Sequence, residues 1–198
     1  MRTTHLLYLH GFRSSPQSMK AQKMAAVVRQ RHPSVHLWCP QLPPSPEAAL
    51  RGVMGEIARW PQQAGYQSLA VVGSSLGGFY ATAVAERTGC KAVLLNPAVE
   101  PARELARYIG EQTAWHNPDE HFFFEPRFVD ELKAQHAGPL KAPGNYLAII
   151  AKGDEVLDWR EMAARYAGTR LRVLEGGDHA LSNFDVLVPE ILDFLALA

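Results

Sequence analysis

The stretch AVVGSSLGGFYATAVAERTG, residues 70–89, joins a short apolar run to a segment rich in small residues. Its pentapeptide GSSLG, residues 73–77, matches G-x-S-x-G, in which the central serine lies on a sharp turn from a strand to a helix. Only Ser75 fits this frame, because a frame centred on Ser74 would require glycine where Val72 stands. The flanking glycines are needed since a Cβ would collide with neighbouring backbone in so tight a turn. The stretch therefore predicts a strand, a turn that presents Ser75, and a helix.

Apolar runs of strand length recur along the chain and alternate with helical patterns. The runs are LLYLH (6–10), VHLWC (35–39), SLAVVG (68–73), KAVLLN (91–96), YLAII (146–150) and LRVLE (171–175). Helices are expected after Ser15-Pro16, over 46–60, over 76–88 with a stop at Gly89, after the capping box Asp158-x-x-Glu161, and in PEILDFLALA at 189–198. This alternation predicts a doubly wound, mostly parallel sheet of about six strands, with ligands beyond the carboxyl ends of the strands.

Residues 98–145 break this rhythm. The segments EPARELARYIGEQTAW and HFFFEPRFVDELKAQH suggest short helices, and so long an insertion in a compact domain is typical of a lid or a binding loop. We therefore expect a single domain over 1–198 with 98–145 as a lid- or cap-like insertion. Its aromatic residues, Phe122 and Phe124 among them, either line an acyl pocket or pack the insertion onto the domain.

Composition excludes several classes of protein. The 198 residues are 47% hydrophobic, enough for one core, and 20 basic side chains balance 20 acidic ones, which argues against a nucleic-acid partner. No apolar run approaches the roughly 20 residues that span a bilayer. The start MRTTHLLYLHGF lacks the pattern of a signal peptide, and Cys39 and Cys90 are expected to be free thiols, so we expect a cytoplasmic protein.

A serine nucleophile needs a general base, normally a histidine that a carboxylate orients. Downstream of a G-x-S-x-G turn the acid comes first and the histidine second. His179 is the only histidine beyond residue 136, and it follows the run LRVLE through the flexible loop GGD. Asp154 directly follows the strand-like YLAIIAKG, a position from which a carboxylate can reach the next loop. We therefore expect Ser75, Asp154 and His179 to form a catalytic triad.

Three other acids compete for the place of Asp154. Asp158 is expected to cap the helix that follows it, and Asp178 lies next to the histidine, where its side chain would usually point elsewhere. Glu100 follows the preceding strand and is the main rival.

An oxyanion intermediate requires preorganised N–H donors. We expect one from the backbone of Leu76, directly after the serine, and one from Phe12 in the loop after the first strand, where Gly11 gives the backbone room. His10 precedes the serine in the chain and is interpreted as a residue that stabilises this loop. No phosphate-binding loop, dinucleotide motif or zinc-spaced cysteine set is present, so the sequence implies no cofactor and no metal.

The motifs YLHGFRSSPQSMKA, VVGSSLGGFYATAVAER, LLNPAVEP, KGDEVLDW and GGDHALSNF together resemble the YqiA-like esterase family of small bacterial α/β-hydrolases, from about residue 5 to residue 185. The resemblance implies a serine esterase acting on acyl esters or acyl-CoA thioesters. The nucleophile, acid and base of that family fall on Ser75, Asp154 and His179. One departure is Leu181, where an aromatic residue is common, and it is expected to alter the substrate pocket beside the base.

The sequence thus predicts an α/β-hydrolase that cleaves a small-molecule acyl ester through an acyl-enzyme. An acyl-CoA thioesterase is one alternative. Two further alternatives are a non-catalytic binding protein of the same fold and an interaction module built on the insertion. The sequence does not indicate an oligomeric state or an acyl chain length.

Overall fold

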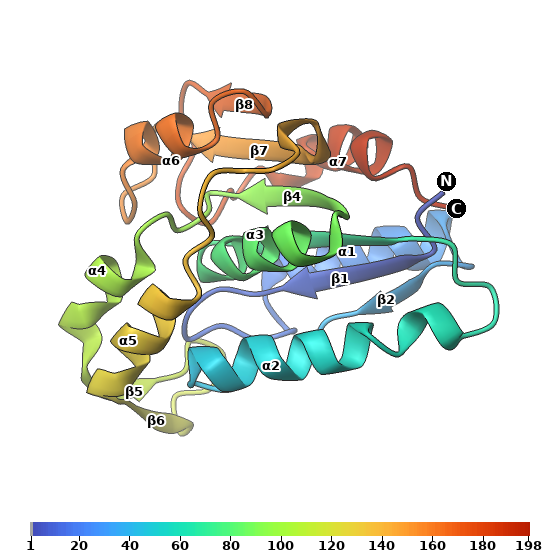
Figure 1. The fold of residues 1–198 in the computed structure, drawn as a ribbon. Helices are drawn as coiled ribbons and strands as arrows, with labels where there is room; N and C mark the ends of the chain where they lie inside the picture. The colour runs from blue at the N-terminus through green and yellow to red at the C-terminus, as the bar shows by residue number, and fades with distance from the viewer. Residues whose placement is uncertain (1) are drawn as a thin grey trace.

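A six-stranded sheet forms the centre of the protein, in the order β2-β1-β3-β4-β7-β8 with every neighbouring pair parallel (Figure 1). The computed structural model describes residues 2–198. The six strands match the six apolar runs of the sequence, which confirms the predicted sheet. Their bounds are β1 His5–Leu9, β2 His36–Trp38, β3 Leu69–Ser74, β4 Lys91–Leu95, β7 Tyr146–Ala151 and β8 Arg170–Leu174.

Helices cover both faces of this sheet, so its central strands are buried on both sides. One face packs against α1 (Met19–Arg31) and α7 (Val188–Leu195), and the other packs against α2 (Pro46–Ile57), α3 (Leu76–Thr88) and α6 (Trp159–Arg165). Single turns of 3₁₀-helix lie at η1 Trp60–Gln62, η2 Ala106–Tyr108, η3 Pro143–Asn145 and η4 Phe184–Val186. None of the helices in the described residues is both long enough and apolar enough to cross a bilayer.

Two helix ends follow the predicted signals, whereas α2 and α7 end at Ile57 and Leu195, before the expected 60 and 198. Gly89 ends α3 with φ +73°, the left-handed conformation that glycine adopts freely, and the Asp158 carboxylate caps α6 by accepting from the Arg160 amide at 2.9 Å. The first helix, however, begins at Met19 and not directly after Ser15-Pro16, because the Ser15 carbonyl and hydroxyl close a separate turn before it.

The insertion contains a β-hairpin that the sequence did not predict. Between α4 (Pro101–Leu105) and α5 (Pro126–Ala134), the strands β5 (Gly110–Thr113) and β6 (His121–Phe124) pair antiparallel. The expectation of short helices is thus correct only at the two ends. Three consecutive phenylalanines favour an extended backbone, in which successive side chains point to opposite faces. Figure 1 places this hairpin, α4 and α5 beyond the carboxyl ends of the parallel strands.

Candidate active site

Ser75 lies on the sharp turn between β3 and α3, and its backbone is held in a strained conformation with φ +55°. Its amide donates to the Leu95 carbonyl at 3.0 Å, which fixes the turn to the neighbouring strand. A Cβ on Gly73 would lie 2.1 Å from the carbonyl oxygen of Gly77, and a Cβ on Gly77 would lie 2.0 Å from that of Leu9. Both glycines are therefore required for the turn to form against β1.

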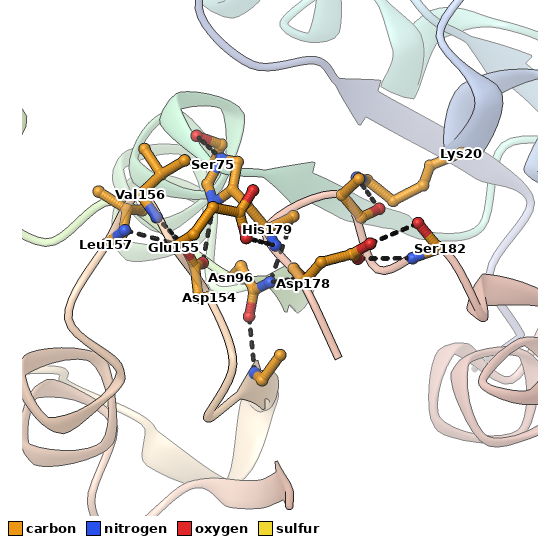
Figure 2. A network of polar contacts seen from close by, with 12 residues as sticks. Lys20, Ser75, Asn96, Asp154, Glu155, Val156, Leu157, Asp178, His179 and Ser182 are labelled. Carbon is orange, nitrogen blue, oxygen red and sulfur yellow. Dashed lines mark hydrogen bonds and ion pairs between the residues drawn. The ribbon is translucent and has the colours of Figure 1, made fainter. Parts of the chain in front are cut away.

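The side chains of Ser75, His179 and Asp154 form one hydrogen-bonded chain (Figure 2). His179 Nδ1 lies 2.8 Å from Asp154 Oδ2, and its Nε2 lies 3.0 Å from Ser75 Oγ. A carboxylate at Nδ1 keeps the proton on that nitrogen, which leaves Nε2 free to accept from the serine hydroxyl. The buried Asp154 is held in turn, because its Oδ1 accepts from the amides of Val156 and Leu157, each at 2.8 Å.

The competing acids have other partners. Asp158 caps α6, and the Asp178 carboxylate accepts from the hydroxyl and the amide of Ser182 at 2.5 and 2.8 Å, which holds the pKa of Asp178 below its usual value. Glu100 lies 3.5 Å from the imidazole of His136.

Two residues that sequence reasoning did not single out hold the loop that carries the histidine. The Asn96 amide nitrogen donates to the carbonyls of Asp178 and His179 at 3.0 and 3.2 Å, while its oxygen accepts from the Ala151 amide at 2.8 Å (Figure 2). The Glu155 carboxylate accepts from the His179 amide at 2.9 Å. Asn96 directly follows β4 at the carboxyl edge of the sheet and lies within the motif LLNPAVEP, and this position is the signal that could have found it.

The two expected oxyanion donors lie on either side of the turn. Leu76 is the first residue of α3, so its amide has no acceptor within the helix. Phe12 follows Gly11, and the loop passes so close to the turn that a Cβ on Gly11 would lie 3.2 Å from the Cβ of Ser75. The role of the two amides as an oxyanion hole stays a prediction.

His10 holds the loop that carries Phe12. Its Nδ1 donates to the Gly11 carbonyl at 3.0 Å and its Nε2 accepts from the Leu42 amide at 3.1 Å, an arrangement that requires the neutral ring. Burial lowers the pKa of His10, which favours the same form. The ring therefore connects two loops, in keeping with the stabilising role expected for it.

A cavity of about 370 Å³ opens over Ser75 and His179. The insertion forms one wall of it, and the loop after β1 forms another. The apolar side chains that line the cavity include those of Phe12, Leu76, Pro101, Leu105, Tyr108, Trp115, Val156 and Leu157. The cavity can thus accept an apolar group beside the serine hydroxyl.

The three residues expected to shape a substrate pocket lie outside this cavity. Phe124 and Phe122 pack their rings against Phe12, with centroids 5.3 and 5.9 Å apart, so they support the loop that carries Phe12. Phe122 also lines a separate cavity of about 180 Å³. Leu181 turns away from the site and is fully buried in the core that includes Phe184, because the backbone has φ +51° there.

Arg13 attaches the hairpin to the loop after β1. Its Nε donates to the Thr113 carbonyl at 2.5 Å, and the Trp115 amide donates back to the Arg13 carbonyl at 2.8 Å. Its guanidinium carbon also lies 4.2 Å from the centre of the Trp115 ring. The insertion is therefore bound to the Phe12 loop by hydrogen bonds as well as by aromatic packing.

The histidines of the insertion do not converge on one point. His116 lies 3.0 Å from Glu120, whereas His121 contacts Thr113 at 3.2 Å and Glu111 at 3.8 Å. Within residues 2–198 no three histidine, cysteine, aspartate or glutamate side chains are placed to hold a metal ion.

Comparison with known proteins extends the resemblance seen in the sequence. Residues 5–196 match the model of an uncharacterised protein family, UPF0227, which contains the YqiA-like proteins. The chain belongs to this family. A UPF0227 protein from Shewanella sediminis is 22% identical over 169 residues, which cover 82% of this chain and 83% of that protein.

Solved structures confirm the α/β-hydrolase fold. Mouse alpha/beta hydrolase domain-containing protein 10 superposes with a TM-score of 0.70 at 14% identity, over 98% of this chain and 91% of that one. The esterase domain of a Rhodothermus marinus protein superposes with a TM-score of 0.68 at 18% identity, over 97% and 85% of the two chains. At these identities the likeness concerns the fold.

Proposed function

We propose that this protein is a serine hydrolase that cleaves carboxylic esters of small molecules through an acyl-enzyme intermediate. The observation that carries the proposal is the chain of hydrogen bonds from Ser75 through His179 to Asp154, inside a cavity with an apolar wall. The esterase domain from Rhodothermus marinus has the same fold, which supports this reaction class.

In the proposed reaction His179 Nε2 takes the proton of Ser75 Oγ as this oxygen attacks the acyl carbonyl. Asp154 keeps the imidazole in the required tautomer and stabilises its positive charge. The amides of Phe12 and Leu76 donate to the oxyanion, and loss of one such donor typically costs about 3 to 4 kcal/mol of transition-state stabilisation.

The tetrahedral intermediate then collapses, and the imidazolium protonates the leaving oxygen. Water, activated by the same His179, attacks the acyl-enzyme and releases the acid from Ser75. The strained backbone of the serine and the close packing of its glycines keep the hydroxyl fixed throughout.

Two alternatives remain to be tested beside the ester hydrolase. A thioesterase would use the same residues, because the acyl carbonyl is attacked in the same way. A non-catalytic binding protein of this fold is disfavoured by the complete hydrogen-bonded set, since binding alone does not require all three side chains.

Steady-state hydrolysis of p-nitrophenyl esters of graded acyl length, beside the matching acyl thioesters, tests the proposal. We expect turnover that falls by a factor on the order of 10⁶ in kcat in Ser75→Ala. The matched control is Ser74→Ala, because Ser74 ends β3 and no hydrogen bond joins its hydroxyl to His179 in residues 2–198. A folded wild-type protein that cleaves none of these substrates would contradict the proposal, and thioester turnover without ester turnover would favour the thioesterase.

A further inference from the structure

The cavity has a polar side that the proposed ester chemistry does not use. Lys20, in the first turn of α1, lines the cavity, and its ammonium donates to the carbonyl of Ala180, the residue after the base. Figure 2 shows Lys20 on one side of His179, and Val156 and Leu157 of the apolar wall on the other. The cavity therefore extends past the base in two chemically different directions.

The charges around the cavity are unbalanced, although the chain as a whole has equal numbers of acidic and basic residues. Arg13, Lys20 and Arg107 line the cavity, and none of the three forms an ion pair with a carboxylate of residues 2–198. The acidic side chain that lines the cavity is Glu104, which lies 3.5 Å from Arg103. A site of this composition attracts an anion.

Lys20 is the cation best placed to bind a ligand. Arg13 is engaged by the hairpin, and Arg107 is exposed and stacks on Tyr108 at 5.0 Å. Lys20, by contrast, is partly buried and has one neutral oxygen as its acceptor, so two of its N–H groups remain available.

Electrostatics and unused polar groups support this assignment. Lys20 forms no ion pair within residues 2–198, and burial lowers its pKa to about 8 although Asp178 and Asp154 act in the opposite direction. Two hydroxyl groups of residues that line the same cavity also lack hydrogen bonds that they could form. Ser18 is the N-cap of α1 but its side chain makes no capping bond, and the buried hydroxyl of Tyr8 has no hydrogen-bond partner within the described residues.

We propose that the cavity selects esters that carry an anionic group, a carboxylate or an oxyanion of similar size, and that Lys20 binds this group. The inference rests on the proposed ester hydrolysis at Ser75. The anionic group can belong to the acyl part of the substrate or to its leaving group, and the geometry is the same in both cases: a negative charge on the side of His179 opposite to Val156.

Two matched substrate pairs test the proposal. For the acyl part, p-nitrophenyl hydrogen glutarate is compared with p-nitrophenyl pentanoate, which has the same chain length and no charge. For the leaving group, the butyrate of a carboxylated p-nitrophenol is compared with p-nitrophenyl butyrate. Each ester is assayed with wild type, Lys20→Met and the control Lys23→Met, whose lysine lies on the same helix and pairs with Asp185 outside the cavity.

We expect Lys20→Met to lower kcat/KM about tenfold for at least one anionic ester, the size of a lost hydrogen bond to a charged group, and less than twofold for its neutral partner. Lys23→Met should change neither. The pair that responds identifies whether the charge belongs to the acyl part or to the leaving group.

Equal losses for charged and neutral esters would overturn the proposal, because they would show that Lys20 merely holds the Ala180 carbonyl. Failure of wild type to accept either anionic ester would also overturn it. If neutral esters are not cleaved by wild type either, the proposed function itself has failed, so the two failures are distinguishable.

Discussion

Replacement of Asn96 by alanine should impair both folding and catalysis, because this buried side chain joins β7 to the loop of the base. Its amide makes three hydrogen bonds, two to carbonyls of the histidine loop and one from the Ala151 amide. At a net value of about 1 kcal/mol for each bond, Asn96→Ala loses about 3 kcal/mol of unfolding free energy. Its backbone has φ +41°, a conformation that asparagine tolerates better than alanine, which adds to the loss.

Urea unfolding measures the stability, and hydrolysis of p-nitrophenyl butyrate by fully folded protein measures the activity. We expect kcat/KM of Asn96→Ala to fall by 10- to 100-fold, since about 1 Å of displacement of the His179 imidazole costs about that factor. The control is Asn145→Ala, which removes one bond from a partly exposed amide to the Gly89 carbonyl and should cost at most about 1 kcal/mol. Equal stability losses in the two variants, or full activity in folded Asn96→Ala, would show that the Asn96 amide does not hold the histidine loop.

Three further predictions concern the acid, the turn and the charge in the cavity. Asp154→Asn should lower kcat by about 10⁴ in the ester assay, because the imidazole of His179 would take the wrong tautomer. Asp158→Asn keeps a good helix cap and should retain activity in the same assay. The reverse ranking of the two variants would exclude Asp154 as the acid of the triad. Gly77→Ala should abolish activity and destabilise the fold, because the added Cβ would clash with β1. In the control Gly52→Ala no atom lies within 4 Å of the added carbon, so the unfolding free energy measured in urea titrations should rise by about 0.5 to 1 kcal/mol. The preference for anionic over neutral esters should decline as pH rises from 7 to 9, because Lys20, with a pKa of about 8, loses its charge over this range. A ratio of kcat/KM values that does not vary with pH would contradict this.

Local signals were sufficient to predict the sheet and the serine turn. The four central strands, β1, β3, β4 and β7, are buried on both faces, which demands continuous apolar runs, and each of the six runs in the sequence became a strand. The glycine spacing around Ser75 follows from two clashes, one within the turn, where a Cβ on Gly73 would meet Gly77, and one with the neighbouring strand β1, where a Cβ on Gly77 would meet Leu9. Chain order then indicated Asp154 and His179, because in a parallel sheet the loops after successive strands meet at one edge.

The hairpin of the insertion, the role of Asn96 and the orientation of Leu181 could not be predicted, because they depend on contacts between segments that are distant in the sequence. The pairing of β5 with β6 involves four residues on each strand, too few to leave a readable period, and its attachment by Arg13 joins residues 100 positions apart. Asn96 reaches a loop more than 80 residues away. Leu181 lies beside the base in the chain, but a left-handed residue turns its side chain into the core, and single residues of this kind carry no sequence pattern.

Labelling with a fluorophosphonate, followed by mass spectrometry of the peptides, tests most directly whether the serine turn is a reactive centre. We expect a single phosphonyl group on Ser75, no label in Ser75→Ala, unchanged labelling in Ser74→Ala, and strongly slowed labelling in His179→Ala. A folded wild-type protein that remains unlabelled, or a label on Ser74, would contradict this expectation.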